Sequence, residues 1–446
     1  MQGRTPRTLL TTAVALGLLA VTPAAEAVRV SPGSFTGYAF DQCQAPSQAA
    51  MDTWRERSPY AGVGVYIAGD NRFCQWERPA DYQGPPGLPN PNLTPAWVSA
   101  QSRKGWRILP ITVGRQASCW DDGNATTTYI SPSPANSYAA AKAQGRAEAV
   151  STIKASEYFG FPKKTTHWLD IEHFDVTNDD CRRSMLGFVS GWTGKLHQLG
   201  YRSGFYSSGS SGITAIEGAR TLSPGSYNLP DQIWIADWNG KVTVRSPWVA
   251  KDAWVGQRMH QYRGSHVETH GGVAIEIDSN WLEVGGGTKA PRVRKHCRGV
   301  RVDFPTYGVQ RRGSSGDRVR ALQCLLREKR LLSGDLTERY DRRVVKAVKR
   351  FQDRVGLRQS GVTRKATWVA LLSSGPSPLV KVGSGSDAVR RVQRAVNAAT
   401  TARLAVTGVY DQATERAVKA YQGGLGVPRT GVVATTLWAS LHSGDL

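Results

Sequence analysis

The segment THWLDIE, residues 166–172, is typical of a short buried strand that ends in two carboxylates. Apolar and β-prone residues lead up to Asp170, and Glu172 follows two positions later. Because successive side chains of a strand point to opposite faces, residues two apart share a face, with backbones about 6 to 7 Å apart. We therefore expect Asp170 and Glu172 to project together from one strand end.

Seven further runs between residues 35 and 281 have the same strand-like character. They are FTGYAFD (35–41), AGVGVYIAG (61–69), RILPITVG (107–114), RSGFYSS (202–208), QIWIADW (232–238), MHQY (259–262) and GVAIEID (272–278). Helical or loop-length segments separate them, and the alanine-rich segment 134–160 predicts a long helix. A strand and helix alternation repeated eight times over about 250 residues favours a (β/α)8 TIM-type barrel, with an open doubly wound sheet as the alternative.

Acidic residues stand where several of these strands end. Asp41 ends the first run, Asp170 and Glu172 the fourth, Asp237 the sixth and Asp278 the eighth. Active sites of such barrels form at the carboxyl ends of the strands. Cleavage of a glycosidic bond uses one protonated carboxyl and one ionised partner, and repulsion among crowded carboxylates raises at least one pKa. The pattern therefore predicts an acidic cleft, with an exposed strand edge as the plainer interpretation.

The order of these motifs resembles glycoside hydrolase family 25, the lysozyme-type N-acetylmuramidases, and more closely the glycoside-hydrolase-like family 1906. The matching motifs are Gly37-x-x-x-Asp41 with Gln44 and Ser47, Asp170-x-Glu172, Trp234-Ile235-Ala236-Asp237-Trp238, Gln261-Tyr262 and Asp278-x-Asn280. The resemblance covers nearly the whole expected barrel. Two segments, 74–94 and 119–129, depart from the lysozymes, so the resemblance does not fix the shape of the cleft or the bond that is cleaved.

The resemblance implies a role for each of these positions. Glu172 is expected to act as general acid/base, Asp170 as its partner, and Asp41 and Asp278 as flanking carboxylates that position substrate or water. The expected substrate-binding residues are Trp168, Tyr206, Trp234, Asp237, Trp238 and Gln261. The four aromatic rings among them are expected to be platforms that stack on sugars, although a tryptophan taken alone is more often part of a core. The implied reaction is hydrolysis of β-1,4 glycosidic bonds in peptidoglycan or a related wall glycan, without metal or cofactor. The alternative hypothesis keeps the cleft as a non-catalytic glycan-binding site.

The last third of the chain is a duplication with a period of 70 residues. At this shift GSSGDRVRALQ (313–323) aligns with GSGSDAVRRVQ (383–393), and about nineteen of the seventy paired positions are identical without a gap. The spacing of apolar residues predicts three short helices in each unit, with Asp317 and Asp387 as N-caps of the first helices. We expect two small three-helix bundles.

Both units resemble the type 1 peptidoglycan-binding domain. The shared pattern is a glycine-containing start to the first helix, a Tyr-Asp turn, an Ala-Val-x-x-Phe/Tyr-Gln helix, and a Gly-Val turn before a tryptophan. The resemblance is good for 307–375 and weaker for 379–444, where Ser386, Val392 and Gly423-Gly424 depart from the pattern. It implies that the chain binds peptidoglycan, and two linked copies would raise avidity.

Charge is distributed unevenly along the chain. Of the formal net charge of +22, the segment from Thr288 onward supplies most, with 31 basic against 11 acidic side chains. A basic segment of an exported protein seeks polyanions such as teichoic-type polymers and wall carboxylates, and we do not expect nucleic acid as a partner. A solvated, solubilising surface is the alternative.

The first 27 residues have the basic, apolar and small-residue order of a secretory signal peptide. No later run reaches the roughly 20 apolar residues that span a bilayer. We therefore expect a secreted, wall-associated monomer without a membrane anchor. Cysteines of an exported chain favour disulfides, and we expect the sequential pairs Cys43 with Cys74, Cys119 with Cys181 and Cys297 with Cys324. The spacing of cysteines and histidines predicts no zinc site.

These observations divide the chain into five segments. They are a signal peptide (1–27), the barrel (31–286), a basic linker (287–305) and two peptidoglycan-binding domains (306–375 and 376–446). Because the linker is short and contains proline, we expect the repeats to lie near the barrel rather than on a long tether.

Overall fold

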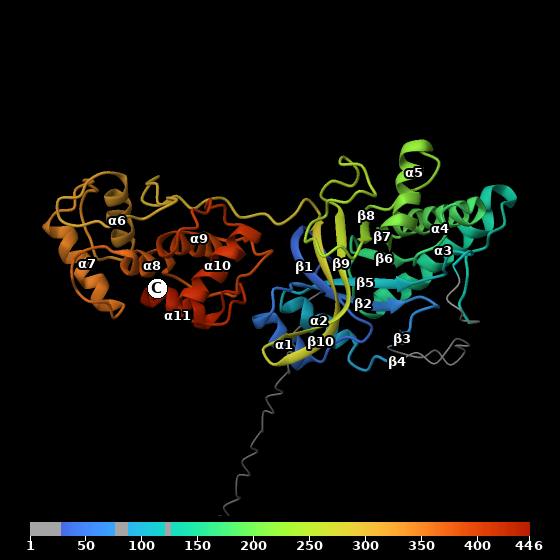
Figure 1. Ribbon diagram of the computed structural model, residues 1–446, viewed down its shortest axis with the longest axis horizontal. Coiled ribbons are helices and arrows are strands. Elements are labelled where there is room, and N and C mark those ends of the chain that lie inside the picture. Colours follow the sequence, from blue (N-terminus) through green and yellow to red (C-terminus); the bar gives the residue numbers. More distant parts are fainter. Residues whose placement is uncertain (1–27, 76–87, 121–125) are drawn as a thin grey trace, which may run out of the picture.

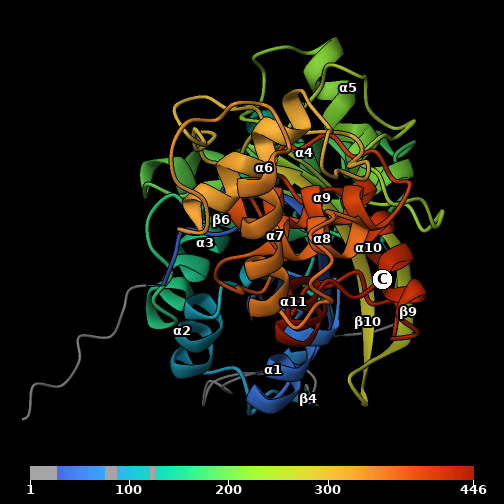
Figure 2. The same cartoon turned by 90° about the vertical axis from the view of Figure 1, so that its left-hand side faces the viewer.

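The computed structural model describes residues 28–75, 88–120 and 126–446. The chain forms a barrel lobe and a helical lobe that lie side by side (Figure 1), and Figure 2 shows the helical lobe from its free end. The expected signal peptide and parts of the two departing segments, 76–87 and 121–125, lie outside the described residues. Among the residues described, no helix combines the length and apolar character that a bilayer crossing requires.

Each of the eight strand-like runs forms a strand of one closed barrel. The strands are β1 (Phe35–Asp41), β2 (Gly62–Ala68), β5 (Arg107–Val113), β6 (Thr166–Asp170), β7 (Arg202–Ser208), β8 (Gln232–Ala236), β9 (Arg258–His270) and β10 (Val273–Val284). Around the barrel they follow the order β1, β10, β9, β8, β7, β6, β5 and β2. Two short strands, β3 (Cys74–Gln75) and β4 (Leu88–Pro89), form a separate pair. The predicted barrel is confirmed, and the open-sheet alternative is wrong.

The closing strand departs from a strict alternation of strands and helices. Strand β10 pairs antiparallel with both β9 and β1, whereas the other neighbours in the barrel are parallel. β9 and β10 are two arms of a long hairpin that turns at Gly271 and Gly272, both with positive φ (Figure 1). The prediction that Asp278 stands at the carboxyl end of a strand is wrong. Asp278 lies within β10. Because β10 runs in reverse, Asp278 is still level with Asp41, its partner in the register.

Helices pack around the outside of the barrel. They are α1 (Gln48–Arg57), α2 (Pro95–Arg103), α3 (Ala135–Tyr158), α4 (Asp179–Gln198) and α5 (Thr214–Leu222), with a π-helical turn at Gly209–Ile213. The long helix predicted from the alanine-rich segment is α3. It approaches α4 closely at two glycines, which have no Cβ. A Cβ at Gly145 would overlap the backbone at Phe188, and a Cβ at Gly191 would overlap the backbone at Lys142. The two glycines therefore fix the close contact of these helices.

Two large aromatic side chains fill the barrel interior. Trp168 is fully buried and Trp234 is 1% exposed, and their rings meet edge to face with centroids 5.5 Å apart. Leu109, Met259 and Leu282 belong to the same buried cluster. The expectation that Trp168 and Trp234 offer surfaces for stacking on sugars is wrong, because both rings are enclosed in the core.

Three disulfides tie loops to the framework. They join Cys43 to Cys74, Cys119 to Cys181 and Cys297 to Cys324, with Cα atoms 5.4, 5.8 and 5.9 Å apart. These are the sequential pairs expected from the sequence. The third disulfide attaches the linker to the first helix of the first repeat.

The duplicated region forms two bundles of three helices. The first contains α6 (Asp317–Glu328), α7 (Arg342–Arg354) and α8 (Lys365–Ser373), and the second contains α9 (Asp387–Ala399), α10 (Gln412–Gly424) and α11 (Thr435–Ser443). Equivalent backbone bridges pair Ser315 with Arg339 in one repeat and Gly385 with Val409 in the other. The predicted repeat architecture is confirmed.

The helix caps differ from the prediction. Asp317 and Asp387 are the first helical residues rather than the N-caps, which are Gly316 and Ser386. The Ser386 hydroxyl accepts a hydrogen bond from the Val389 N–H, so the departure from the glycine pattern supplies a capping side chain. The two aspartates keep a favourable position in the first turn, where the helix dipole is positive.

Candidate active site

Four carboxylates meet at the end of the barrel where β1 and β6 end. Asp41 is the last residue of β1 and faces Asp278 of β10 in the register. Asp170 is the last residue of β6, and Glu172 follows two positions later. The charges are close enough to interact, since Glu172 raises the pKa of both Asp170 and Asp41. The structure thus brings together the four acids that the sequence singled out.

A glutamine from the loop that follows β5 fixes the chain at the end of β6. The Gln116 amide donates to the carbonyl of Asp170 at 3.1 Å and accepts from the N–H of Glu172 at 2.8 Å. Gln116 is itself 1% exposed. Its amide therefore holds the backbone on both sides of Ile171 and sets the direction of the two carboxylates.

Asp41 is held by side chains from two other strands. The Asn280 amide donates to its Oδ1 at 2.6 Å, and the Tyr66 hydroxyl donates to its Oδ2 at 3.2 Å. Asn280 in turn accepts from the indole N–H of Trp234 at 2.8 Å. Trp234 thus contributes to the site from inside the core, by orienting the amide that orients Asp41.

Gln261 connects Asp278 to two aromatic residues. Its amide oxygen accepts from the Tyr206 hydroxyl at 3.0 Å and from the Trp238 indole N–H at 2.9 Å, and its amide nitrogen lies 3.4 Å from Oδ2 of Asp278. Trp238 is 67% exposed and lies against Gly264, where a Cβ would overlap the indole. Of the predicted aromatic platforms, Trp238 is the one whose ring is open to solvent.

Burial raises the pKa of the two carboxyls on β1 and β10. The pKa of Asp41 rises to about 6, because desolvation and the Glu172 charge outweigh the hydrogen bonds from Asn280 and Tyr66, which lower it. The pKa of Asp278 rises to about 7, through burial and then the charge of Asp41. Both groups therefore change protonation close to neutral pH.

Asp170 is buried, as Asp41 is. It is 5% exposed, and its Oδ1 has no hydrogen-bond partner among the described residues. Burial and then the charges of Glu172, Asp41 and Asp278 raise its pKa well above the ordinary value. The pKa of Glu172 is also raised, by burial and then by Asp278. Glu172 is partly exposed, so it is the member of the β6 pair that reaches solvent.

A cleft of about 460 Å³ opens beside the cluster. Asp41, Tyr66 and Asp278 line it, together with residues of the segment after β1, of β4 and of the hairpin. These residues include Gln42, Gln44, Leu88, Ser265 and Glu276. The cleft therefore gives access to the carboxylate cluster at Asp41 and Asp278.

One predicted residue lies apart from the four carboxylates. The Asp237 carboxylate accepts a hydrogen bond from the Asn239 amide at 2.7 Å, within the loop that follows β8. Its backbone N–H donates to the Gln261 carbonyl at 3.2 Å. Asp237 thus shapes the loop that carries Trp238, and in the described part of the chain its carboxylate forms no hydrogen bond with the four carboxylates or with Gln261.

Sequence reasoning missed Gln116 and Tyr66 as members of the site. Tyr66 lies in the second strand-like run, and Gln116 stands two residues after the third, so both are near strand ends. A search for polar residues at strand ends, in addition to acids, would have found them.

Among the described residues, Cys297, Cys324 and Glu328 lie close enough together to be considered as metal ligands, but the two cysteines are joined in a disulfide and offer no thiolate.

Family models match both lobes of the chain. The Rv2525c-like, glycoside hydrolase-like domain matches residues 52–282, and the putative peptidoglycan binding domain matches residues 315–371 and 385–441. No curated protein matches the chain.

Solved structures resemble the barrel at low identity. An uncharacterized B. stearothermophilus protein is 17% identical, with a TM-score of 0.33, and the match covers 55% of this chain and 95% of that one. The Mycobacterium tuberculosis Tat-secreted protein Rv2525c in complex with L-tartrate is 14% identical, with a TM-score of 0.35 and coverage of 55% and 95%. A family 25 glycosyl hydrolase from Bacillus anthracis is 11% identical, with a TM-score of 0.29 and coverage of 56% and 89%.

The family models confirm both resemblances found in the sequence. The first model alone spans more than half of the 446 residues, and the second matches both copies of the duplicated unit. The chain therefore belongs to the Rv2525c-like, glycoside hydrolase-like family and carries two peptidoglycan binding domains after its barrel.

Proposed function

We propose that this protein binds peptidoglycan and that its barrel hydrolyses β-1,4 glycosidic bonds of peptidoglycan or a related wall glycan. The glycoside-hydrolase-like barrel and the peptidoglycan binding domains support a function on cell-wall glycan. The observation that carries the hydrolytic part is the group of four carboxylates at the barrel mouth, all with raised pKa.

In the proposed reaction Glu172 is the general acid/base. Burial and the charge of Asp278 raise its pKa, so that it retains a proton to donate to the oxygen of the leaving sugar. As the bond between the anomeric carbon and that oxygen breaks, positive charge develops on the ring, and an ionised carboxylate stabilises it. Water supplies the hydroxyl that completes hydrolysis, and its proton returns to Glu172.

The other three acids position and balance this charge. Asp170, whose backbone the Gln116 amide joins to that of Glu172, is its partner in sharing protons. Asp41 is the carboxylate with the most hydrogen-bond donors, from Asn280 and Tyr66, and these donors favour its ionised form. Asp41 and Asp278 therefore orient substrate or water in the cleft that they line.

Trp238, Tyr206 and Gln261 are the proposed substrate contacts. An exposed indole can stack on the apolar face of a sugar ring, and Gln261 keeps that indole in place through its amide oxygen. The Tyr206 hydroxyl shares the same acceptor. These contacts would orient the glycan across the carboxylate cluster.

We also propose that the protein is exported and acts as a monomer at the cell wall. Three disulfides suit an oxidising compartment outside the cytoplasm. The proposed limits of the domains remain those expected from the sequence. They are 1–27, 31–286, 287–305, 306–375 and 376–446.

The hydrolytic proposal is tested by incubating purified wall glycan with wild type and with Glu172→Gln, and measuring new reducing ends. Wild type should release them, and the variant should release about 10³-fold fewer, because a positioned acid contributes roughly 10² to 10⁴ in rate. Glu157→Gln is the matched control, since this exposed glutamate lies in the last turn of α3 and away from the strand carboxyl ends. Equal release by wild type and Glu172→Gln would reject the proposal.

A non-catalytic glycan-binding barrel is the second candidate. One observation favours it: the cleft is lined by Asp41 and Asp278, and Glu172 is not among its lining residues. Soluble wall fragments that bind with the cleft occupied, yet remain intact from acidic to alkaline pH, would support this candidate over the hydrolase.

A further inference from the structure

The two repeats present the same surface, but it meets different surroundings. We call this surface the loop face and define it as residues 311–316 with 339–343 in the first repeat, and 381–386 with 409–413 in the second. Its backbone is alike in both: the N–H of Gly313 donates to the Tyr340 carbonyl at 3.1 Å, and the N–H of Gly383 donates to the Tyr410 carbonyl at 3.0 Å. The loop faces can therefore be compared position by position.

In the second repeat a buried lysine anchors the loop face to the barrel. Lys381 is 2% exposed, and its ammonium donates to the carbonyls of Arg55, Ser58 and Tyr60. These carbonyls lie at and just beyond the carboxyl end of α1, where the helix dipole favours a cation. Burial lowers the pKa of Lys381, because it disfavours the charged ammonium. The three carbonyls and the Trp106 ring, whose centroid lies 5.3 Å from the ammonium, partly offset this cost of desolvation.

The same loop face approaches β1 and the linker through glycine. A Cβ at Gly383 would overlap the Phe35 ring, and the Gly383 carbonyl accepts from the Thr288 hydroxyl at 3.2 Å. A Cβ at Gly385 would overlap the Lys289 carbonyl. In the first repeat, Gly313 has a positive φ close to that of Gly383 but nothing within 4 Å of its Cβ position. One glycine faces a protein surface and its counterpart faces open space.

Polar and apolar contacts extend this docking surface. Gln412 donates to the Val242 carbonyl at 3.2 Å, and the Tyr38 hydroxyl donates to Glu415 at 3.2 Å. Trp281 of the barrel is 5% exposed and belongs to the same buried cluster as the repeat cores. The second repeat is thus packed on the barrel, as the short linker led us to expect.

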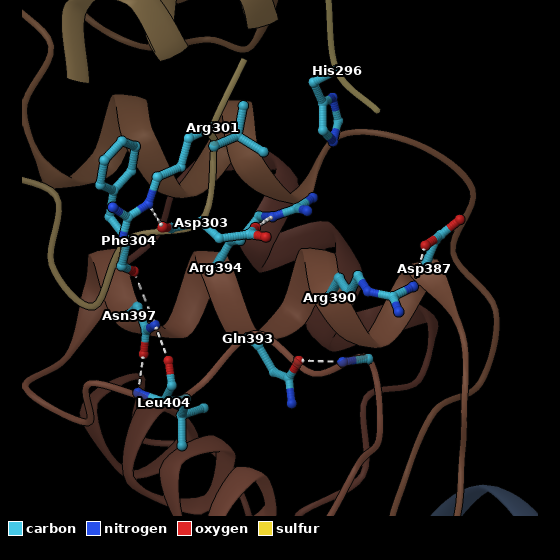
Figure 3. A network of polar contacts seen from close by, with 12 residues as sticks. His296, Arg301, Asp303, Phe304, Asp387, Arg390, Gln393, Arg394, Asn397 and Leu404 are labelled. Carbon is cyan, nitrogen blue, oxygen red and sulfur yellow. Dashed lines mark hydrogen bonds and ion pairs between the residues drawn. The ribbon is translucent and has the colours of Figure 1, made fainter. Parts of the chain in front are cut away.

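The first helix of the second repeat also holds the linker. Figure 3 shows Arg394 paired with Asp303 and Asn397 donating to the carbonyl of Phe304, at 2.6 and 3.2 Å. Arg390 donates to the Pro291 carbonyl at 2.7 Å. The second repeat therefore holds both ends of the connection between the lobes.

The loop face of the first repeat is open and strongly basic. It forms a groove of about 990 Å³, in which Asp341 is the acidic lining residue and pairs with Arg343 at 3.1 Å. Five exposed arginines surround it: Arg311, Arg312, Arg339, Arg342 and Arg343. The equivalent residues of the second repeat are Lys381, Val382, Val409, Gln412 and Ala413. Four of the five arginines thus belong to the open face alone.

We propose that the loop face has taken different partners in the two repeats: the barrel in the second, and the carboxylates of wall peptides in the first. The docked copy shows the kind of ligand that this face accepts, since the ammonium of Lys381 donates to main-chain carbonyls of another segment and Gly385 lies against the Lys289 carbonyl. With guanidinium forks in place of apolar residues, the same face fits a peptide that carries free carboxylates. The wall half of this inference rests on the proposed peptidoglycan function, and the docking half does not.

The wall half is tested by sedimentation of the full chain with purified walls. Arg342→Glu should reduce retention about tenfold or more, because it reverses a charge on the open groove. The matched control is Arg358→Glu, the same charge reversal at an exposed arginine beyond the opposite end of α7, and it should stay within about twofold of wild type. Equal losses in the two variants would overturn the division of roles.

Pretreated walls identify the partner. Walls stripped of phosphodiester polymers with hydrofluoric acid should retain the wild type, and walls stripped of peptides by an amidase should not. The reverse result would assign the groove to a phosphate polymer and overturn the peptide-carboxylate proposal. Neither arm measures hydrolysis, so failure here is distinct from failure of the catalytic proposal, which reducing ends report.

The docking half is tested by the shape of the chain in solution. Lys381→Met keeps most of the side-chain length but removes the charge, and it should increase the radius of gyration and the rate of proteolysis in linker 287–305. Arg311→Met, at the equivalent open position, should change neither. Because a buried site can be sensitive, Thr288→Ala on the linker is a milder second variant, expected to act in the same direction. An unchanged shape in both Lys381→Met and Thr288→Ala would overturn the docking role.

Discussion

The barrel mouth and the loop face of the first repeat use charge in opposite ways. At the mouth, the four carboxylates are buried or partly buried, and desolvation is the largest cause of their raised pKa values. On the loop face, five arginines are exposed around a groove. Buried charges repel one another strongly and hold protons, which suits chemistry, whereas exposed charges act at longer range and are screened by salt, which suits adhesion. The contrast gives each region its own experimental signature.

The largest effect is expected from removing a buried acid. Asp170→Asn should lower the rate of glycan hydrolysis about 10³-fold, because the partner that shares protons with Glu172 is lost. Sedimentation with walls should stay within about twofold, since the variant leaves the basic groove unchanged. Reducing-end release and sedimentation, measured on the same preparation, check both statements. Loss of both properties together would show that the two regions are not independent.

The same variant tests the burial argument through stability. The folded-state pKa of Asp170 lies above the unfolded value of about 3.9, so this group favours folding most below that pH and opposes it as pH rises. Asparagine has no proton to lose. Asp170→Asn should therefore be more stable than wild type at pH 8 and nearly equal at pH 3, in denaturant unfolding. A less stable variant at pH 8 would contradict the account of Asp170 as a strained, desolvated acid.

Truncation after Val284 removes the basic lobe and should abolish retention on walls. It also uncovers Trp281 and Tyr38, which pack against the repeat cluster, so the barrel should lose roughly 2 to 4 kcal/mol of stability. Sedimentation and thermal unfolding measure the two effects. A truncated barrel as stable as the full chain would contradict the packing of the second repeat on the barrel, and retained sedimentation would place wall binding in the barrel.

Added salt should weaken retention on walls more than it slows hydrolysis, with smaller effects than those of the variants above. Raising ionic strength from about 0.1 to 0.5 M shortens the screening length below the size of the groove, so retention on walls should fall several-fold. Hydrolysis of soluble wall fragments should change by less than about twofold, because buried charges are screened much less. The two assays run on one salt series give the comparison directly. Parallel decline would indicate that hydrolysis depends on the arginine groove.

Local sequence pattern was sufficient for most of the architecture. Short apolar, β-rich runs located all eight strands, and the 70-residue shift located both helical bundles. Position relative to strand ends located Asp41, Asp170 and Glu172. These features follow from neighbours along the chain, which is the information that a periodic pattern contains.

The features that were missed depend on neighbours in space. The pattern of β10 gives its strand character but not its direction, so Asp278 was assigned to a strand end when it lies within a strand. Alternation predicts that Trp168 shares a face with Asp170, yet only the closed barrel shows that this face is core. The docked loop face was hidden for the same reason, since Lys381 looks like any surface lysine until α1 is placed against it. The roles of the site residues remain predictions that the variants above address.

The smallest effect is expected from a single hydroxyl at the mouth. Tyr66 donates to Asp41 at 3.2 Å, and this bond lowers the Asp41 pKa against the effect of burial. Tyr66→Phe should therefore raise that pKa above about 6 and move the acidic limb of the kcat/KM profile to higher pH, by less than about one unit. Tyr60→Phe is the control, because Tyr60 is also buried but bonds to Glu268 and Ser279 instead. A limb that moves equally in both variants would reflect altered packing, and a limb that stays in place in Tyr66→Phe would mean that Asp41 is not the group whose ionisation the reaction requires.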